Sequence, residues 1–286
     1  MSVGASSTVH DGPKGMRTRI APTPSGFLHV GNAANALATA WWAASLDGTI
    51  HLRIDDLDSD RVRPEYVDDI LDVLRWLDVD WKTGPRSYQD TLKAREDRVA
   101  RSRTSLQEAV DAGLPAYACR CSRRQITGIP TAGCPGGCRD LGLTLIPHET
   151  ALRLAVDPGT VVRVEDADVD LAAAMGDFVL WRRDDLPAYQ WSSVFEDEQH
   201  TITHILRGRD LIESTAAQSH LAALVDLPFV QRAEVRHHDL VLDESGRKLS
   251  KSQSGRSHGL SRTPATRRRI IETATQIARA NDIPCP

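Results

Sequence analysis

The stretch that decides the fold is residues 18–54, which read TRIAPTPSGFLHVGNAANALATAWWAASLDGTIHLRI. A short β-prone segment, residues 18–22, leads into a turn rich in Pro, Ser and Gly. An alanine-rich helix is predicted over 31–46 and a second strand over 49–54. Strand, loop, helix and strand at this spacing form a βαβ unit, whose two strands pair in parallel. Such sheets bind ligands at the carboxyl ends of their strands, where residues 23–29 and 55–58 lie.

The rest of the chain continues to alternate between helices and strands. Pro64 suits the first turn of a helix, and apolar residues recur after it on one helical face. That predicted buried face consists of Val67, Ile70, Leu71, Leu74 and Leu77. Further helices are predicted over 90–112, from Ser214 or Thr215 to about Val225, and from Thr263 and Pro264 to near Asn281. Further strands are predicted at Val161–Val164, 178–181, 201–206 and 240–242. The fold class is therefore α/β, a nucleotide-binding domain interrupted by an insertion.

Composition is that of a globular protein, and the charge is segregated along the chain. The 286 residues carry a net charge of −4, whereas residues 253–286 hold six Arg against Glu272 and Asp282. A local basic surface of this kind is sufficient for nucleic-acid binding. Residues 1–16 are rich in Gly and Ser, which predicts a disordered tail and no secretory signal. No run approaches the roughly 20 apolar residues that span a membrane, so a cytoplasmic protein is expected.

Four of the five cysteines fall within twenty residues. They read Cys119-x-Cys121, twelve intervening residues, then Cys134-x3-Cys138. Such a cluster in a cytoplasmic protein indicates metal more than disulfides, and four thiolates can form one tetrahedral zinc site. The sequence predicts one structural zinc ion per chain, in an insertion spanning about residues 114–146. Reduced cysteines without metal are the alternative.

Two short motifs have residue types suited to nucleotide phosphates. His29-Val30-Gly31-Asn32 begins the first predicted helix, where backbone N–H groups and a histidine donor can meet phosphate oxygens. Lys248-Leu249-Ser250-Lys251-Ser252 follows a late strand, and its two ammonium groups can meet the charge of a departing pyrophosphate. Taken singly, the first motif can be a turn with a helix cap, and the second a solvated basic loop.

Together, in this order, the two motifs resemble the paired signatures of class I aminoacyl-tRNA synthetases. The residues around them resemble the catalytic core of the glutamyl-tRNA synthetases, and the likeness spans about Arg19 to Ser252. It is carried by RIAPTPSG at 19–26, LRIDD at 52–56, GDF at 176–178, PAY at 187–189 and LRG at 206–208.

The chain is similar in particular to the short glutamyl-Q tRNA(Asp) synthetases of this family, which attach glutamate to the queuosine base of tRNA(Asp). Only 34 residues follow Ser252, which leaves no room for an anticodon-binding domain. The cysteine insertion also resembles the zinc module of the short enzymes, although their third ligand is often a tyrosine where this chain has Cys134. The resemblance implies a Rossmann-like catalytic domain over 17–252, followed by a basic linker and a helix over 253–286.

The resemblance also implies an activity and a set of site residues. The enzyme would use ATP with Mg²⁺ to convert glutamate into glutamyl-adenylate, transfer it to tRNA(Asp) carrying queuosine, and act as a monomer. His29, Lys248 and Lys251 would be catalytic. ATP would contact Pro22, His29, Gly31, Asn32, Lys248, Leu249, Ser250, Lys251 and Ser252. Glutamate would contact Arg19, Ile20, Ala21, Pro22, Thr23, Asp55, Tyr189 and Arg207.

Two of these positions depart from the family pattern, and several alternatives stay open. The family commonly has Ser in place of Thr23 and Glu in place of Asp55, and the shorter Asp favours a water-mediated contact with the α-amino group. The chain could instead charge the 3′ end of tRNA(Glu), act as a nucleotidyltransferase on a small metabolite, or be a non-catalytic amino-acid sensor or RNA-binding relic. The run 236–238, RHH, predicts a solvated strand or loop in preference to a metal site. The run 267–269, RRR, predicts either a contact with tRNA phosphates or a solvated helix face.

Overall fold

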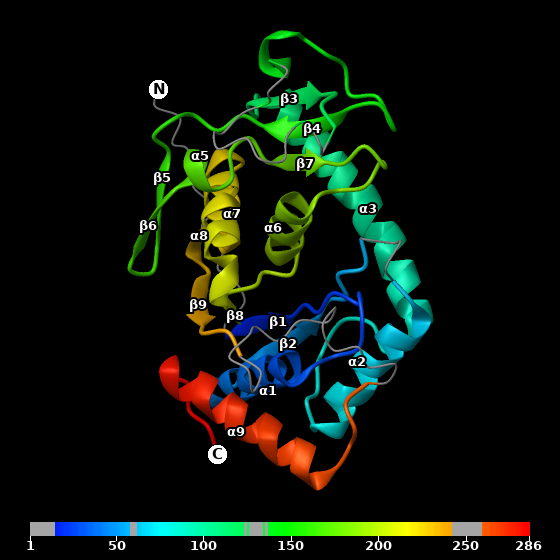
Figure 1. Ribbon diagram of the computed structural model, residues 1–286, viewed down its shortest axis with the longest axis vertical. Coiled ribbons are helices and arrows are strands. Elements are labelled where there is room, and N and C mark those ends of the chain that lie inside the picture. The colour runs from blue at the N-terminus through cyan, green and yellow to red at the C-terminus, as the bar shows by residue number, and fades with distance from the viewer. Residues whose placement is uncertain (1–14, 58–61, 123–124, 126–133, 135–136, 242–258) are drawn as a thin grey trace, which may run out of the picture.

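The computed structural model describes residues 15–57, 62–122, 125, 134, 137–241 and 259–286 (Figure 1). Its parallel sheet has four strands in the order β2-β1-β8-β9. These strands are β1 (Arg17–Ile20), β2 (Thr49–Leu52), β8 (His204–Gly208) and β9 (Glu234–His238). β1 pairs with β2 in parallel, with Thr18 opposite Ile50, and this pairing confirms the predicted βαβ unit.

The strand order places a switch in winding direction between β1 and β8. From β1 the chain passes through α1 (Val30–Ser45) to β2, the strand at one edge of the sheet. From β8 it passes through α7 (Ile212–Leu224) to β9, the strand at the other edge. Because the connections after β1 and β8 leave in opposite directions, a crevice opens between the carboxyl ends of these two strands.

Helices α1, α2 and α9 form one hydrophobic core with the first half of this sheet. α2 (Pro64–Trp76) buries Val67, Ile70, Leu71 and Leu74, and Leu77 is buried just after it, so the predicted face is confirmed. α9 (Pro264–Ala280) begins at Thr263, whose side chain caps the helix by accepting from the Thr266 N–H, and ends before Asn281 as predicted. Figure 1 shows α9 lying against α1, whose many alanines leave room for its close approach.

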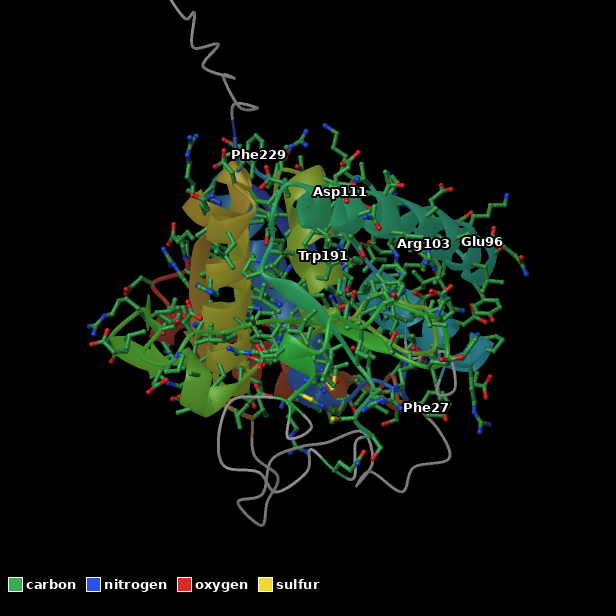
Figure 2. All side chains as sticks on the ribbon, turned by 90° about the horizontal axis from the view of Figure 1, so that it is seen from above. Phe27, Glu96, Arg103, Asp111, Trp191 and Phe229 are labelled. Atoms are coloured by element: carbon green, nitrogen blue, oxygen red, sulfur yellow. The ribbon has the colours of Figure 1, made fainter. Side chains whose placement is uncertain are left out.

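A second group of elements is built around an antiparallel sheet, and the long helix α3 (Tyr88–Asp111) runs toward it from the parallel sheet (Figure 1). Its strands are β3 (Ala116–Cys119), β4 (Ala151–Leu154) and β7 (Val179–Trp181), in the order β3-β4-β7. The hairpin β5 (Val161–Val164) and β6 (Ala167–Asp170) lies beside it, and short helices α5 (Leu171–Ala174) and α8 (Pro228–Arg232) complete this part. α6 (Tyr189–Gln199) is tied to α3 because Trp191 donates its indole N–H to the Ser102 carbonyl oxygen at 3.0 Å (Figure 2).

The strands predicted at 161–164 and 178–181 exist, and both lie outside the parallel sheet, a placement that the sequence left open. The structure differs from the sequence predictions at three points. The last strand is β9 and not 240–242, of which Leu242 lies outside the described residues. α7 begins at Ile212, before the predicted caps Ser214 and Thr215. Met16, expected in the N-terminal tail, is 5% exposed and its carbonyl oxygen accepts from the Thr49 N–H.

The polar sequence of β9 explains why the sequence left residues 236–238 open between a strand and a loop. Arg236 lies over the ring of Trp42 at 4.5 Å, a cation–π contact that lets a charged residue cover an apolar surface. His237 is buried between Thr215 Oγ1 at 2.7 Å and Glu165 Oε1 at 3.0 Å, so the prediction of a solvated segment here was wrong. A strand is usually recognised by a pattern of apolar residues, whereas β9 consists largely of polar residues that have partners in the fold. Trp42 itself is in the core.

The part of the chain described by the model contains no helix with the length and apolar character needed to cross a membrane.

Candidate active site

A cavity of about 510 Å³ lies in the crevice between the carboxyl ends of β1 and β8. It gathers residues from β1, α1, the segment after β2, α6, β8 and the chain after β9. The predicted site residues that line it are Arg19, Ile20, Ala21, Pro22, His29, Gly31, Asn32, Asp55, Tyr189 and Arg207. Thr23 is described but is not among the lining residues, and Lys248, Leu249, Ser250, Lys251 and Ser252 lie outside the described residues. The described chain reaches the cavity at Leu240 and Val241, seven positions before Lys248.

His29 is the N-cap of α1, so the ring and the helix start form one unit. Its Nδ1 accepts a hydrogen bond from the Asn32 backbone N–H at 3.3 Å. A neutral imidazole whose Nδ1 accepts carries its proton on Nε2, which makes Nε2 the donor of this ring. The first N–H groups of α1 add the positive end of a sixteen-residue helix dipole. This corner of the cavity is suited to an anion.

Gly31 allows two distant segments to meet beside this corner. A Cβ at position 31 would lie 3.1 Å from the His29 ring and 3.2 Å from Val241 Cβ. Both distances are shorter than ordinary van der Waals contact, so a side chain here would displace the imidazole, the Val241 segment, or both. The absence of a side chain therefore maintains the geometry at the start of α1.

Two buried arginines supply positive charge to the same cavity. Arg19 is 6% exposed and Arg207 is 5% exposed, and the Nε atom of each lacks a hydrogen-bond partner. Arg207 donates to Gln218 Oε1 at 2.8 Å, and burial lowers its pKa to about 10, so it stays protonated at neutral pH. Burying two cations whose donors are not all used is costly unless an anionic ligand completes them. The arrangement can bind a carboxylate.

Asp55 faces the same cavity and is held there by Arg53. Arg53 Nε donates to Asp55 Oδ1 at 2.8 Å, its NH1 donates to Asp197 Oδ1 at 2.7 Å, and its NH2 donates to Ser193 Oγ at 3.2 Å. Although burial alone would lower it, the pKa of Arg53 is raised well above its ordinary value by Asp55 and Asp197. Asp55 is thus a fixed anion at the cavity edge, able to accept from an ammonium group.

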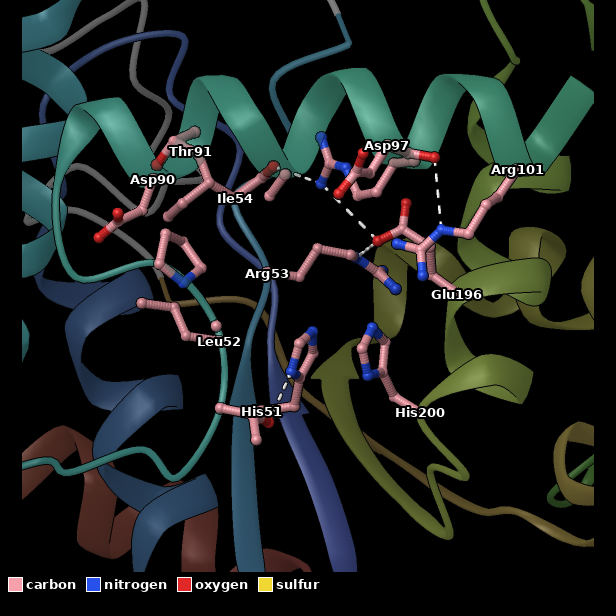
Figure 3. A pocket seen from close by; sticks show the side chains of 15 residues that line it. His51, Leu52, Arg53, Ile54, Asp90, Thr91, Asp97, Arg101, Glu196 and His200 are labelled. Carbon is pink, nitrogen blue, oxygen red and sulfur yellow. Dashed lines mark hydrogen bonds and ion pairs between the residues drawn. The ribbon is translucent and has the colours of Figure 1, made fainter.

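Arg53 also lines a second cavity, of about 370 Å³, on the side of β2 that faces α3 and α6 (Figure 3). His51 and His200 stack there with ring centroids 3.7 Å apart, and burial lowers the pKa of His51 to about 3. Glu196 reaches the same space, 3.8 Å from Arg53 Nε and 3.7 Å from Arg98 NH1. Burial raises the pKa of Glu196 to about 7. The two cavities therefore share a wall, and Arg53 is part of it.

Comparison with known proteins relates this geometry to a family. The family model described as tRNA synthetases class I (E and Q), catalytic domain, matches residues 15–132 and 146–265. The chain belongs to that family. The match includes both strands that border the cavity and the segment that holds the two predicted lysines.

Several relatives match most of the chain. It is 34% identical over 288 residues to a glutamyl-Q tRNA(Asp) synthetase from Rhodobacter capsulatus, covering 90% of this chain and 99% of that one. It is 38% identical over 252 residues to a protein of the same name from Burkholderia orbicola, covering 83% and 80%. It is also 31% identical over 264 residues to glutamate–tRNA ligase 2 from Nitrosococcus oceani, covering 85% of this chain and 54% of that one.

The fold is shared with solved members of the family. The glutamate–tRNA synthetase structure from Elizabethkingia anophelis superposes with a TM-score of 0.67 over 83% of this chain, at 22% identity. The chain spans about half the length of that protein, 52%. The predicted fold class, a class I synthetase catalytic domain of the α/β type, is confirmed.

The sulfur atoms of the four clustered cysteines lie close together, as their spacing in the sequence predicts. Their Sγ atoms all lie within 4.8 Å of one another, and Cys121 Sγ is 3.8 Å from Cys138 Sγ. Four sulfurs around one tetrahedral zinc would lie roughly 3.8 Å apart, given a Zn–S distance of about 2.3 Å. Gly137 adopts a left-handed φ of 61° and its N–H bonds the Cys134 carbonyl oxygen at 3.0 Å, which closes the turn between two of the thiols. The cluster can hold a metal ion.

Several cavity residues were not identified from the sequence. Asn35 lies one helical turn beyond Asn32 on α1, and the buried Oδ1 atoms of both lack a partner. The i, i+3 spacing of two asparagines on an otherwise apolar helix is the sequence signal for this pair. Asp210 and His238 also line the cavity, from the ends of β8 and β9. His238 was not assigned to the site because the run 236–238 was predicted to be solvated, whereas His238 is buried beside the cavity.

Proposed function

We propose that this protein activates glutamate with ATP as glutamyl-adenylate and transfers the glutamyl group to the queuosine base of tRNA(Asp). The observation that carries the proposal is the single cavity that joins a helix start suited to phosphate with two buried arginines suited to a carboxylate. Relatives that carry the name glutamyl-Q tRNA(Asp) synthetase support this acceptor, since one of them matches this chain over 99% of its own length.

The proposed selection of glutamate follows from the charges in the cavity. Arg19 and Arg207 would bind a carboxylate of the amino acid, since each is a buried cation that lines the cavity. Tyr189 would line the pocket, and Asp55 would accept from the α-amino group. An amide in place of the side-chain carboxylate would leave the buried cations uncompensated, which disfavours glutamine strongly.

The proposed chemistry is an in-line displacement at the α-phosphorus of ATP. A carboxylate oxygen of glutamate forms the new bond to phosphorus, and the bond from phosphorus to the bridging oxygen breaks as pyrophosphate leaves. The α-carboxylate is already ionised at neutral pH, so no general base is needed. His29 Nε2–H and the N–H groups of α1 would bind phosphate oxygens. Lys248 and Lys251 would meet the charge that develops on pyrophosphate, and ATP would enter with its Mg²⁺.

The cysteine cluster is proposed as a structural zinc site. The donor set of four sulfurs is the one that zinc prefers in closed structural sites. The zinc would hold the end of β3 to the turn at Gly137 and would take no part in the displacement.

Pyrophosphate exchange tests the activation step. The chain would be incubated with ATP, labelled pyrophosphate and each of the twenty amino acids in turn. Glutamate alone should support exchange, and exchange without any amino acid should stay at background. Exchange with no amino acid, or with another amino acid in preference to glutamate, would contradict the proposal.

The acceptor is tested separately. tRNA(Asp) carrying queuosine should accept labelled glutamate, whereas the same tRNA with guanine at that position should not. RNase digestion should then place the label on the anticodon fragment. The second candidate, charging of the 3′ end of tRNA(Glu), is favoured by the match to glutamate–tRNA ligase 2 and would place the label on the terminal adenosine.

A further inference from the structure

Asp197 of α6 lies behind the active-site arginines, outside the set of residues that line the cavity. Its side chain is 5% exposed, and its Oδ1 is 2.7 Å from Arg53 NH1 and 3.5 Å from Arg19 Nε. Burial alone would raise the pKa of Asp197, but Arg53, Arg19 and Arg207 together lower it, so the side chain is an anion at neutral pH. The charge of this buried carboxylate therefore acts on three arginines.

The three arginines have different numbers of partners. Arg53 is fully engaged by Asp55, Asp197 and Ser193. The guanidinium of Arg19 has fewer partners: within the described part of the chain, it makes an ion pair with Asp197. Arg53 is thus a fixed support, and Arg19 is a cation held along one edge, with the rest of its guanidinium available to the cavity.

We propose that Asp197 is a positioning residue, which orients Arg19 and thereby sets the preference of the site for a carboxylate side chain over an amide. The inference rests on the proposed function, because glutamate is taken as the amino acid. A planar guanidinium gains from two parallel hydrogen bonds only when its plane is fixed before the ligand arrives. The Asp197 oxygen beside Nε supplies that constraint; Arg53 fixes Asp197 in turn, and Ser193 helps to hold Arg53.

Orientation and simple charge attraction predict opposite effects for Asp197→Asn. The substitution is isosteric and removes one negative charge beside three arginines. If charge alone mattered, the more positive site would bind glutamate more tightly. If Asp197 acts by orientation, Arg19 becomes mobile and glutamate binds more weakly, while glutamine is affected less.

The test is pyrophosphate exchange by the full chain with glutamate and with glutamine. For Asp197→Asn we expect KM for glutamate to rise roughly 10- to 100-fold. The change in kcat should be small, and the ratio of kcat/KM for glutamate to that for glutamine should fall by a similar factor. Glu198→Gln is the matched control, since Glu198 lies one residue further along α6 and accepts from the N–H groups of Phe229 and Val230, away from the cavity. It should leave the ratio unchanged.

A second variant keeps the test decisive if Asp197→Asn does not fold. Ser193→Ala removes one of the bonds that hold Arg53, and it should lower the same ratio by about threefold. A lower KM for glutamate in Asp197→Asn, or an unchanged ratio in Ser193→Ala, would overturn the inference. Absence of glutamate-dependent exchange in the wild-type chain would instead refute the proposed function.

Discussion

Glu196 and Asp197 are adjacent on α6, yet their surroundings shift the two carboxyl groups in opposite directions. Asp197 has three arginines close to it, and their charges outweigh its burial. Glu196 is farther from its cations, and burial outweighs them, which raises its pKa to about 7. Burial and the distance to the nearest guanidinium, more than residue type, decide which of the two acids is charged at neutral pH.

The raised pKa of Glu196 predicts a pH dependence of stability. The unfolded chain has the ordinary pKa of 4.5, so the folded state holds the proton more tightly. The stability that this proton contributes is present at low pH and is lost as pH rises from 4.5 through about 7, by at most about 3 kcal/mol. Glu196→Gln does not titrate and should therefore gain stability relative to wild type between pH 5 and pH 8, measured by urea unfolding. Glu96→Gln, an exposed carboxylate on α3, should show no such gain.

A second prediction at this scale concerns Lys251. If it meets the charge on the departing pyrophosphate, Lys251→Ala should lower glutamate-dependent exchange by about 100- to 1,000-fold. The thermal unfolding midpoint should stay close to that of the wild type. Lys93→Ala, which removes an exposed lysine on α3, is the control and should exchange normally. Normal exchange by Lys251→Ala would refute the assignment.

At the scale of elements, the sequence predicted local structure well and left the sheet membership of the later strands open. Residues 18–54 gave the first βαβ unit because the helix and both strands lie in one short stretch, with Gly and Pro marking the turn. The face of α2 was predictable because its apolar residues repeat with the helical period. Whether Val161–Val164 would join the parallel sheet depends on contacts between segments far apart in the chain, and periodicity carries no such information.

The candidate site shows the same contrast between residues close together in the sequence and residues brought together only by folding. The residues of β1 and the start of α1 were found from motifs within fifteen positions of one another. Arg53 and Asp197 are 144 positions apart and meet through a buried ion pair. Arg53 lies within the LRIDD stretch, but nothing in that stretch indicates its pairing, and Asp197 has no local pattern that marks it, because burial and pairing are properties of the folded chain.

The cysteine insertion allows a prediction about one element and its metal. Cys134→Ser should lower the zinc content of the purified protein below one ion per chain, measured by elemental analysis. The free energy of unfolding should fall by about 2 kcal/mol or more, since a metal ligand is lost. Cys285→Ser removes the thiol that lies outside the cluster and should leave the zinc content unchanged. Equal zinc in both variants would contradict a four-sulfur site.

At the scale of the whole molecule, the cavity joins the two βαβ halves of the parallel sheet. A ligand that contacts both halves binds the folded state and not the unfolded chain, so it should raise the thermal midpoint. Glutamate at 100 times its Kd should add about 2.7 kcal/mol of stability, measured by calorimetry or dye binding. Arg19→Ala should abolish the shift caused by glutamate and preserve the shift caused by ATP. Loss of both shifts would mean that the variant had disrupted the fold and not the glutamate contact alone.

The contact that Gly31 permits has a consequence for how this chain can change over time. Position 31 and position 241 are separated by most of the sequence, yet each limits the volume available to the other. A methyl group added at position 31 requires the His29 ring or the Val241 side chain to move by a few tenths of an ångström. A chimera with a homologue that has a larger residue at position 31 should therefore be more stable when position 241 comes from the same homologue.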